Sequence, residues 1–173
     1  MPNSCWITGA SSGIGESTAL YFAKNGYTVF ASARSSEDLS NLEKKSRDSS
    51  FKGKIIALPI DVTKADNILN AIKFIEKETQ NLEFIILNAG TYIKEDSKCA
   101  TIKSTKHTID LNFTAIFNHI ILLQPYFSIL NIKQIAVVSS MAAWRGMPMS
   151  AAYSSSKAAI KTAIESFEID YSD

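Results

Sequence analysis

The chain has 173 residues, of which 46% are hydrophobic and 20% charged, which is enough apolar material for one domain with a core. We therefore expect a single domain over residues 1–173 rather than two. The 18 basic and 17 acidic side chains leave a net charge of +1, which is too small to provide a general field for nucleic acid or an anionic membrane surface. Partners should therefore be small molecules bound at local sites.

Cysteine and histidine are few, and their spacing predicts neither a disulfide framework nor a metal site. Cys5 and Cys99 lie in different segments with no CxxC or Cys/His spacing, so they are expected to be structural thiols. His107 and His119 lack paired carboxylates at ligand spacing. The N-terminal residues have no leader pattern, and no apolar run approaches the roughly 18 residues of a membrane span. The expected location is the reducing cytoplasm, with no membrane partner.

Short runs rich in β-branched and aromatic residues alternate along the chain with longer stretches of helical periodicity. This alternation predicts βαβ units, and therefore an α/β fold with a mostly parallel sheet. Several runs are apolar on successive residues, which is typical of strands covered on both faces. The five predicted strands are Ser4–Thr8, Tyr27–Ser32, Lys54–Ile60, Glu83–Asn88 and Gln134–Ser140.

Five helices are predicted between and after these strands. In the third, Thr63 is placed to cap the first turn, and Ile68, Ile72 and Ile75 mark one apolar face. In the fourth, Pro125 lacks an N–H and its ring clashes with the preceding turn, so the helix should kink or end early. The predicted helices are Ile14–Lys24, Ser36–Arg47, Lys64–Gln80, Ile109–Leu130 and the segment from Ala151 onward.

A glycine-rich loop, TGASSGIG, follows the first strand directly and opens the first helix. Glycines at positions 9, 13 and 15 let the backbone turn sharply and approach a diphosphate, and the N–H groups that begin the helix point at its negative charge. The alternative is an ordinary glycine turn. Because a strand precedes the loop and a helix follows it, as a dinucleotide site requires, the sequence favours the dinucleotide site.

Three motifs in this order resemble those of the short-chain dehydrogenase/reductase family: TGASSGIG, then NAG at residues 88–90, then YSSSK at residues 153–157. The resemblance implies a Rossmann-like, doubly wound, three-layer fold with the five strands in the order 3-2-1-4-5. It also implies an NADP or NAD cofactor. The implied cofactor-binding residues are Gly9, Ser11, Ser12, Gly13, Ile14, Gly15, Arg34, Asp61, Val62, Asn88, Ala89, Gly90, Tyr153 and Lys157.

The residues after the second strand favour NADP over NAD. In folds of this kind an acidic residue there suits a free ribose 2′-hydroxyl, and a basic one suits a 2′-phosphate. Ala33 stands where the acidic residue is expected, and Arg34 follows with a guanidinium that can grip a phosphate with two hydrogen bonds. The alternative is that Arg34 is a solvated cation, which Glu37 or Asp38 can pair with when no cofactor is bound.

Asp61 follows the third predicted strand. It resembles the aspartate with which the family contacts adenine. The alternative is that its carboxylate caps the following helix, and the two roles are compatible.

Tyr153 and Lys157 are four residues apart, so on a helix they share a face. A phenol titrates near pH 10 in water, and a nearby ammonium would stabilise the phenolate and bring its pKa closer to neutrality. This assigns Tyr153 as the acid/base that exchanges a proton with a carbonyl oxygen, and Lys157 as its activator. The alternatives are a packed aromatic side chain and a solvated cation.

Two polar residues complete the predicted catalytic set. Ser140 lies at the end of the fifth predicted strand, where its hydroxyl can hold the substrate oxygen, and the family's spacing from serine to tyrosine selects it over Ser139. Asn112 is an amide within an apolar helix, which is costly unless it is hydrogen-bonded. The family's matching asparagine holds a water that links the lysine to solvent. The alternatives are a turn hydroxyl and an amide satisfied by backbone.

The resemblance covers the chain from Ser4 almost to its end, but family members usually continue past this point. A sixth strand, a segment that covers the substrate and a seventh strand are expected beyond Asp173 and are missing from this sequence. We therefore expect an uncovered edge on the fifth strand and a site without a lid. Trp144, Met147 and Met149 make the loop from 139 to 149 bulky and apolar. They indicate either an apolar or aromatic carbonyl substrate, or packing against the missing segment.

The sequence therefore predicts an NADP-dependent oxidoreductase that interconverts a carbonyl compound and an alcohol. The alternative is a shortened relative that binds NADP(H) without turnover, or that scaffolds a partner through the exposed fifth strand. By analogy with the family, a homo-oligomer is expected through helices 109–130 and 151–171.

Overall fold

The computed structural model describes residues 3–49 and 51–171. This part of the chain divides into two compact units. The first consists of residues up to 89 together with 119–138, and the second of residues 90–118 and 139 onward. The glycine loop lies in the first unit, whereas the predicted catalytic residues all lie in the second.

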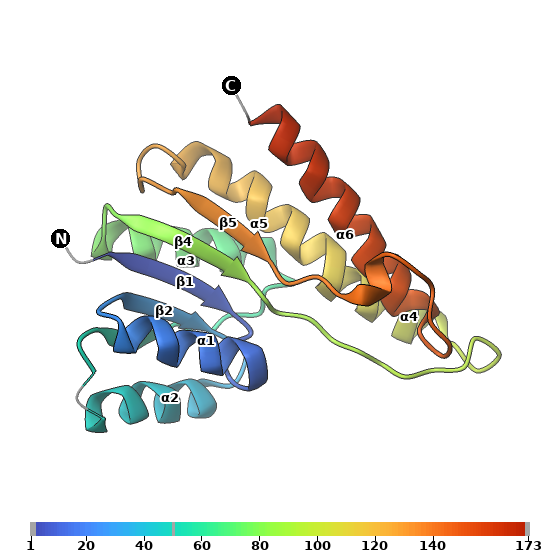
Figure 1. The fold of residues 1–173 in the computed structure, drawn as a ribbon, viewed down its shortest axis with the longest axis horizontal. Coiled ribbons are helices and arrows are strands. Elements are labelled where there is room, and N and C mark those ends of the chain that lie inside the picture. Colours follow the sequence, from blue (N-terminus) through green and yellow to red (C-terminus); the bar gives the residue numbers. More distant parts are fainter. Residues whose placement is uncertain (1–2, 50, 172–173) are drawn as a thin grey trace. The chain divides into compact units, whose positions relative to one another are not determined.

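The first unit is built on a five-stranded parallel sheet, and the predicted strand order is confirmed. The order is β3-β2-β1-β4-β5, so β5 is an edge strand, as expected, and pairs with β4 (Figure 1). The register aligns Cys5 with Val29 and with Phe84 across β1. The strands are β1 Ser4–Thr8, β2 Thr28–Ser32, β3 Lys54–Ala57, β4 Leu82–Leu87 and β5 Gln134–Val137.

Two predicted strands extend three residues too far at their C-terminal ends. β3 ends at Ala57 instead of Ile60, because Pro59 has no N–H to continue the ladder. The N–H groups of Leu58 and Ile60 still donate to the carbonyls of β2 and of the residue after it, at 2.9 and 3.0 Å. β5 ends at Val137 instead of Ser140, since its partner β4 has already ended at Leu87.

Helices cover both faces of this sheet. On one face lie α1 Gly13–Lys24 and α2 Ser36–Asp48 (Figure 1). Their buried residues pack with alternate strand residues such as Cys5 and Ile7. On the other face the intervening strand residues point the opposite way. Trp6 there contacts His119, with ring centroids 5.3 Å apart, and Phe30 contacts Phe74 of α3 Ala65–Glu78 at 6.4 Å. The predicted three-layer Rossmann-like α/β fold is therefore confirmed.

The third predicted helix has the expected apolar face but a different start. Ile68, Ile72 and Ile75 of α3 are all fully buried. The residue that precedes the first turn is Lys64, not Thr63. The hydroxyl of Thr63 instead donates to Asp61 Oδ1 at 2.7 Å, so it turns back toward β3 and not into the helix.

The fourth predicted helix differs from the expectation at both ends. It begins as α4 Ile102–Ile109, seven residues earlier than predicted, because Thr101 and Ser104 form a reciprocal capping box at its start. A π-helical turn, η1 Asp110–Thr114, follows, and then α5 Ala115–Leu123. α5 gives way to a 3-10 turn at Gln124–Tyr126, which confirms the expected effect of Pro125.

The second unit also contains the 3-10 turn η3 Met141–Ala143 and the long helix α6 Ala151–Asp170. Within this unit, α6 packs against α4, η1 and η3. No helix among residues 3–49 and 51–171 has the length and apolar character needed to cross a bilayer. The same residues contain no cluster of three His, Cys, Asp or Glu side chains that could bind a metal ion.

Candidate functional site

The glycine loop of the first unit has the backbone geometry that a dinucleotide site needs. Gly9 and Gly13 have φ of +67° and +58°, values that side chains disfavour. A Cβ at Gly9 would lie 2.8 Å from Ala89 Cα, and one at Gly15 would lie 2.3 Å from Gly9 O. A Cβ at Gly13 would meet no atom within 4 Å. Two glycines therefore allow close packing within the protein, whereas Gly13 faces open space.

Asn88, in the NAG motif, braces this loop from the neighbouring strand. Its side-chain amide donates to the carbonyls of Thr8 and Gly9, at 3.0 and 3.1 Å. In return, the Thr8 hydroxyl accepts the N–H groups of Asn88 and Ala89, at 3.0 and 3.1 Å. The first and second motifs are thus joined by four hydrogen bonds. The two hydrogen bonds from the Asn88 amide therefore stabilise the conformation of the glycine loop.

The start of α1 fits a phosphate group. The residue that precedes α1, Ser12, is exposed and its side chain makes no capping hydrogen bond, so the first N–H groups of the helix are not closed off by it. Such a helix start favours an anion through its N–H groups and its dipole. Gly13 leaves the approach open, and Ile14 is 65% exposed beside it. These residues fit the diphosphate of a dinucleotide.

Arg34 and Asp61 follow β2 and β3 in the same unit, beyond the strand ends at Ser32 and Ala57. Arg34 is exposed, and in the described part of the chain no ion pair joins it to Glu37 or Asp38. Asp61 accepts hydrogen bonds from Thr63, and although partial burial opposes the effect, these bonds and the charges of Lys64 and Arg34 lower its pKa. Asp61 does not precede the first turn of α3, so the capping alternative is wrong. Val62, next to it, is buried.

In the second unit, α6 holds Tyr153 and Lys157 on one face, as predicted. Lys157 Nζ lies 6.0 Å from the centroid of the Tyr153 ring. Only 4% of Lys157 is exposed, and this burial lowers the pKa of its ammonium group. Because Lys157 is poorly solvated, its ammonium group interacts more strongly with a neighbouring negative charge than an ammonium group in water does.

Asn112 connects three segments of the second unit. It lies fully buried in the π-helical turn η1. Its Oδ1 accepts the Thr91 N–H at 2.7 Å, and its Nδ2 donates to the Thr91 carbonyl at 2.9 Å and to Ser156 Oγ at 3.1 Å. Ser156 in turn donates to the Tyr153 carbonyl at 2.7 Å. The Asn112 side chain therefore links the segment after NAG to the backbone of the predicted acid/base.

Ser140 directly precedes η3. Its Oγ accepts the Ala142 N–H at 3.1 Å, and no hydrogen-bond acceptor for its own proton is found among the described residues. The hydroxyl is therefore held in place as an acceptor and can still donate to an oxygen of a ligand. Since η3 packs on α6, Ser140 and Tyr153 are carried by neighbouring segments of one unit.

The loop after Ser140 presents large apolar side chains. Trp144 is 73% exposed, and the exposed fractions of Met147 and Met149 are 54% and 42%. Lys161 of α6 lies over the Trp144 ring, with Nζ 4.1 Å from its centroid. The three large apolar side chains of this loop are thus exposed, and one of them is already engaged by a cation.

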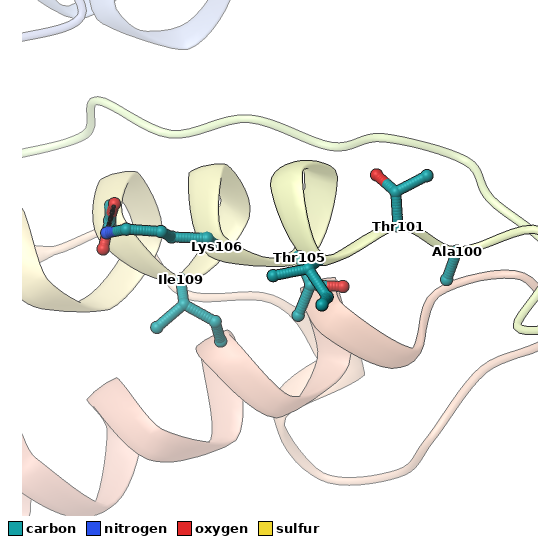
Figure 2. A pocket seen from close by; sticks show the side chains of 7 residues that line it. Ala100, Thr101, Thr105, Lys106 and Ile109 are labelled. Carbon is teal, nitrogen blue, oxygen red and sulfur yellow. Dashed lines mark hydrogen bonds and ion pairs between the residues drawn. The ribbon is translucent and has the colours of Figure 1, made fainter.

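A cavity of about 440 Å³ lies along α4, away from the predicted catalytic residues. Ala100, Thr101, Thr105 and Ile109 line it, and Thr105 and Ile109 extend from the same side of α4 (Figure 2). Lys106 is also in its wall and forms an ion pair with Asp110 at 2.6 Å. The cavity holds none of the residues that the motifs selected.

Comparisons with known proteins agree with the motifs. The family model described as short chain dehydrogenase matches residues 3–173. The chain belongs to this family. It is 34% identical over 166 residues to an uncharacterised oxidoreductase of Myxococcus xanthus, covering 95% of this chain and 64% of that protein.

Two other relatives of the chain carry the name of an activity. The chain is 32% identical over 158 residues to a 3-oxoacyl-(acyl-carrier-protein) reductase of Thermotoga maritima, covering 90% of this chain and 63% of that protein. A 3-ketoacyl-ACP reductase structure from Sinorhizobium meliloti is 28% identical, with a TM-score of 0.87 over 96% of this chain and 66% of that one. The chain thus spans slightly less than two thirds of the curated relatives named here.

Several residues contact the predicted site residues although the motifs did not select them. Thr8 ties the glycine loop to NAG, and Ser156 ties Asn112 to Tyr153. Tyr92 packs on Tyr153 with ring centroids 4.9 Å apart. Ser156 was visible inside YSSSK, and Thr8 inside TGASSGIG. Tyr92 gave no signal because its contact depends on how the segment after NAG folds.

Proposed function

We propose that the protein is an NADP-dependent oxidoreductase that interconverts a ketone or aldehyde and the corresponding alcohol. The observation that carries the proposal is the pairing on α6: Lys157 is buried, its pKa is lowered by that burial, and it lies beside the ring of Tyr153. A titratable group that is buried and lies beside a second titratable group is typical of functional sites. In the proposed reaction Lys157 stabilises the phenolate form of Tyr153.

The residues that would hold the cofactor are those of the glycine loop, the start of α1, Arg34 and Asp61. Arg34 supports NADP, because it is exposed and has no acidic partner at Glu37 or Asp38. When bound, the cofactor supplies or accepts the hydride. The short chain dehydrogenase relatives that reduce 3-oxoacyl or 3-ketoacyl groups support a carbonyl substrate.

The chain's own residues handle the proton and the oxygen. Tyr153 donates a proton to the carbonyl oxygen during reduction and accepts it back during oxidation. Ser140 donates a hydrogen bond to the same oxygen and stabilises the charge that develops on it. Lys157 lowers the energy of the phenolate. Asn112 holds Thr91 and Ser156 in place next to Tyr153 through its hydrogen bonds. In the proposed proton relay, a water held by Asn112 would link Lys157 to solvent.

In this proposal residues 1–173 form a single domain. By analogy with the family, the protein is a cytoplasmic homo-oligomer that associates through helices 109–130 and 151–171. Sedimentation analysis over a hundredfold range of protein concentration tests this association, and a monomer mass throughout would contradict it.

The test of the reaction is the Tyr153→Phe variant. NADPH oxidation is followed by absorbance with a panel of ketones and aldehydes, and NADPH binding by fluorescence. We expect turnover to fall by about 10²–10⁴-fold, the usual contribution of a positioned acid or base, with binding retained. Tyr21→Phe is the matched control, since Tyr21 is 65% exposed on α1. Unchanged turnover in Tyr153→Phe contradicts the proposal, and binding of NADPH by the unmodified protein without any turnover supports the non-catalytic alternative.

A further inference from the structure

Tyr92, two residues after the NAG motif, lies directly against the predicted acid/base. Its ring centroid is 4.9 Å from that of Tyr153, and the two rings are inclined at 60°. This is the separation and tilt of a favourable aromatic pair. Tyr92 nevertheless remains 53% exposed, so much of its surface is available to a ligand.

The hydroxyl of Tyr92 is already engaged. It lies 3.1 Å from Ser150 Oγ, and Ser150 Oγ donates its one proton to the Pro148 carbonyl at 3.1 Å. Since that proton is used, the bond between the two hydroxyls has Tyr92 as the donor. The Tyr92 hydroxyl therefore has no second proton to donate, and what Tyr92 offers a ligand is dispersion and ring contacts rather than a new donor.

The surrounding backbone holds this ring in one place. Both polar backbone groups of Thr91 are bonded to Asn112. On the other side, the N–H of Glu95 donates to the Met149 carbonyl at 3.1 Å. Met149 has φ of +57°, a left-handed conformation that costs a non-glycine residue about 1–2 kcal/mol. Strain of this kind persists only where the surroundings fix it, so Tyr92 is preorganised before any substrate arrives.

We propose that Tyr92 is a specificity-determining residue, whose exposed ring contacts the carbon skeleton next to the reacting carbonyl and selects substrates with a flat, apolar substituent there. This inference rests on the proposed function for its place in a reaction, and it names the substrate class of that same site. The apolar side chains of Met147 and Met149, which lie in the loop leading to α6, are consistent with it. Ser150 is a positioning residue that holds the Tyr92 ring through its hydroxyl.

The test compares two ketones that differ only in flatness, acetophenone and cyclohexyl methyl ketone. The readout is the ratio of their kcat/KM values, because a ratio cancels losses common to both substrates. Tyr92→Leu keeps an apolar side chain but removes the ring. We expect it to lower the preference for acetophenone by about two- to tenfold, the range that an aromatic pair contributes. Tyr92→Phe should retain most of the preference, and Ser150→Ala should reduce it partly by freeing the ring.

The matched control is Tyr21→Leu, the same change at an exposed tyrosine of the first unit, which should leave the ratio unchanged. A ratio that is equal in the unmodified protein and in Tyr92→Leu overturns the inference.

Binding of acetophenone in the presence of NADP, measured by saturation-transfer NMR, separates this inference from the proposed function. If the unmodified protein reduces neither ketone but binds acetophenone more strongly than Tyr92→Leu does, the proposed function fails and the role of Tyr92 stands. Equal binding by both proteins overturns the role of Tyr92, whatever the turnover.

Discussion

The glycine loop gives the sharpest test of the first unit, because two of its glycines should respond to alanine for different reasons. In Gly15→Ala the new Cβ would lie 2.3 Å from Gly9 O and 2.6 Å from Asn88 Nδ2. An ordinary contact begins near 3.4 Å, so the new Cβ would be about 1 Å too close to Gly9 O. The backbone around this oxygen is held in place by the four hydrogen bonds that join Thr8 and Gly9 to Asn88 and Ala89.

The direction in which Gly15→Ala changes the free energy of unfolding tests this close approach. Alanine in the first turn of a helix is favoured over glycine by about 1 kcal/mol, so without a clash Gly15→Ala would stabilise the protein. Overpacking against backbone costs about 1–3 kcal/mol or more. We expect the clash to prevail, with the free energy of unfolding lower by about 2 kcal/mol.

Gly13→Ala is the matched comparison. Its Cβ would meet nothing within 4 Å, but φ of +58° costs alanine about 1–2 kcal/mol, partly offset by the lower entropy of the unfolded chain. We expect a loss of about 1 kcal/mol in stability. The methyl group would also stand in the open approach to the start of α1, so NADPH binding should weaken more than stability suggests.

Urea unfolding measures both effects. Trp6 is fully buried in β1 and reports the first unit, provided that the exposed Trp144 is first replaced by phenylalanine. Titration with NADPH, followed by fluorescence, measures the change in NADPH affinity. If Gly15→Ala is as stable as the parent protein or more so, the loop does not pass over α1 at the distance seen here, and the reasoning is refuted.

Two further predictions concern charged groups of the first unit. Arg34→Ala should weaken NADPH binding by about 10–100-fold, as for the loss of a charge-assisted hydrogen bond, while NADH binding stays unchanged. The control is Arg47→Ala, at an exposed arginine paired with Glu43. Equal effects of Arg34→Ala on both cofactors would exclude recognition of the 2′-phosphate. Glu83→Gln should lower the free energy of unfolding by about 1.5–3 kcal/mol at pH 7. Hydrogen bonds from Lys133 and Tyr27, opposed by burial, lower the pKa of Glu83 below its ordinary 4.5, so its contribution is present above that value and is lost as the pH falls through the lowered pKa. Unfolding curves from pH 2 to 7 should therefore converge for the two proteins in acid, and a constant difference would contradict the assignment.

The regular elements followed from the sequence because each depends on local patterning. The β1 bounds were predicted to the residue, and α3 has its predicted apolar face, since alternation and helical periodicity reflect which side is buried. The errors lie where local rules compete. The capping box at Thr101 uses serine where glutamate or glutamine is usual, so the start of α4 gave a weak signal. Pro59 removed the donor that would have extended β3.

The candidate site was predictable in its motifs and unpredictable in its connections. The sequence places Tyr153 and Lys157 on one helix face. It does not show that Ser156 joins the Tyr153 carbonyl to Asn112, or that Tyr92 packs on Tyr153. Those contacts depend on the path of the segment after NAG and on a π-helical turn, and neither has a periodic signature. Residues that support a site are therefore found only when the fold brings distant segments together.

Left-handed backbone in this protein falls into two kinds. Gly26 and Asn131 have φ of +94° and +51°, and each is of a residue type that adopts this conformation easily where the chain turns. Gly9 and Gly13 adopt left-handed conformations in the glycine loop. Met149, with φ of +57°, differs because its side chain gains nothing from that conformation. Among residues 3–49 and 51–171 it is the one left-handed residue that is neither glycine nor asparagine. The Met149 carbonyl accepts the Glu95 N–H and the Ser150 hydroxyl bonds to that of Tyr92, so the strain is maintained at the start of α6, the helix that carries Tyr153.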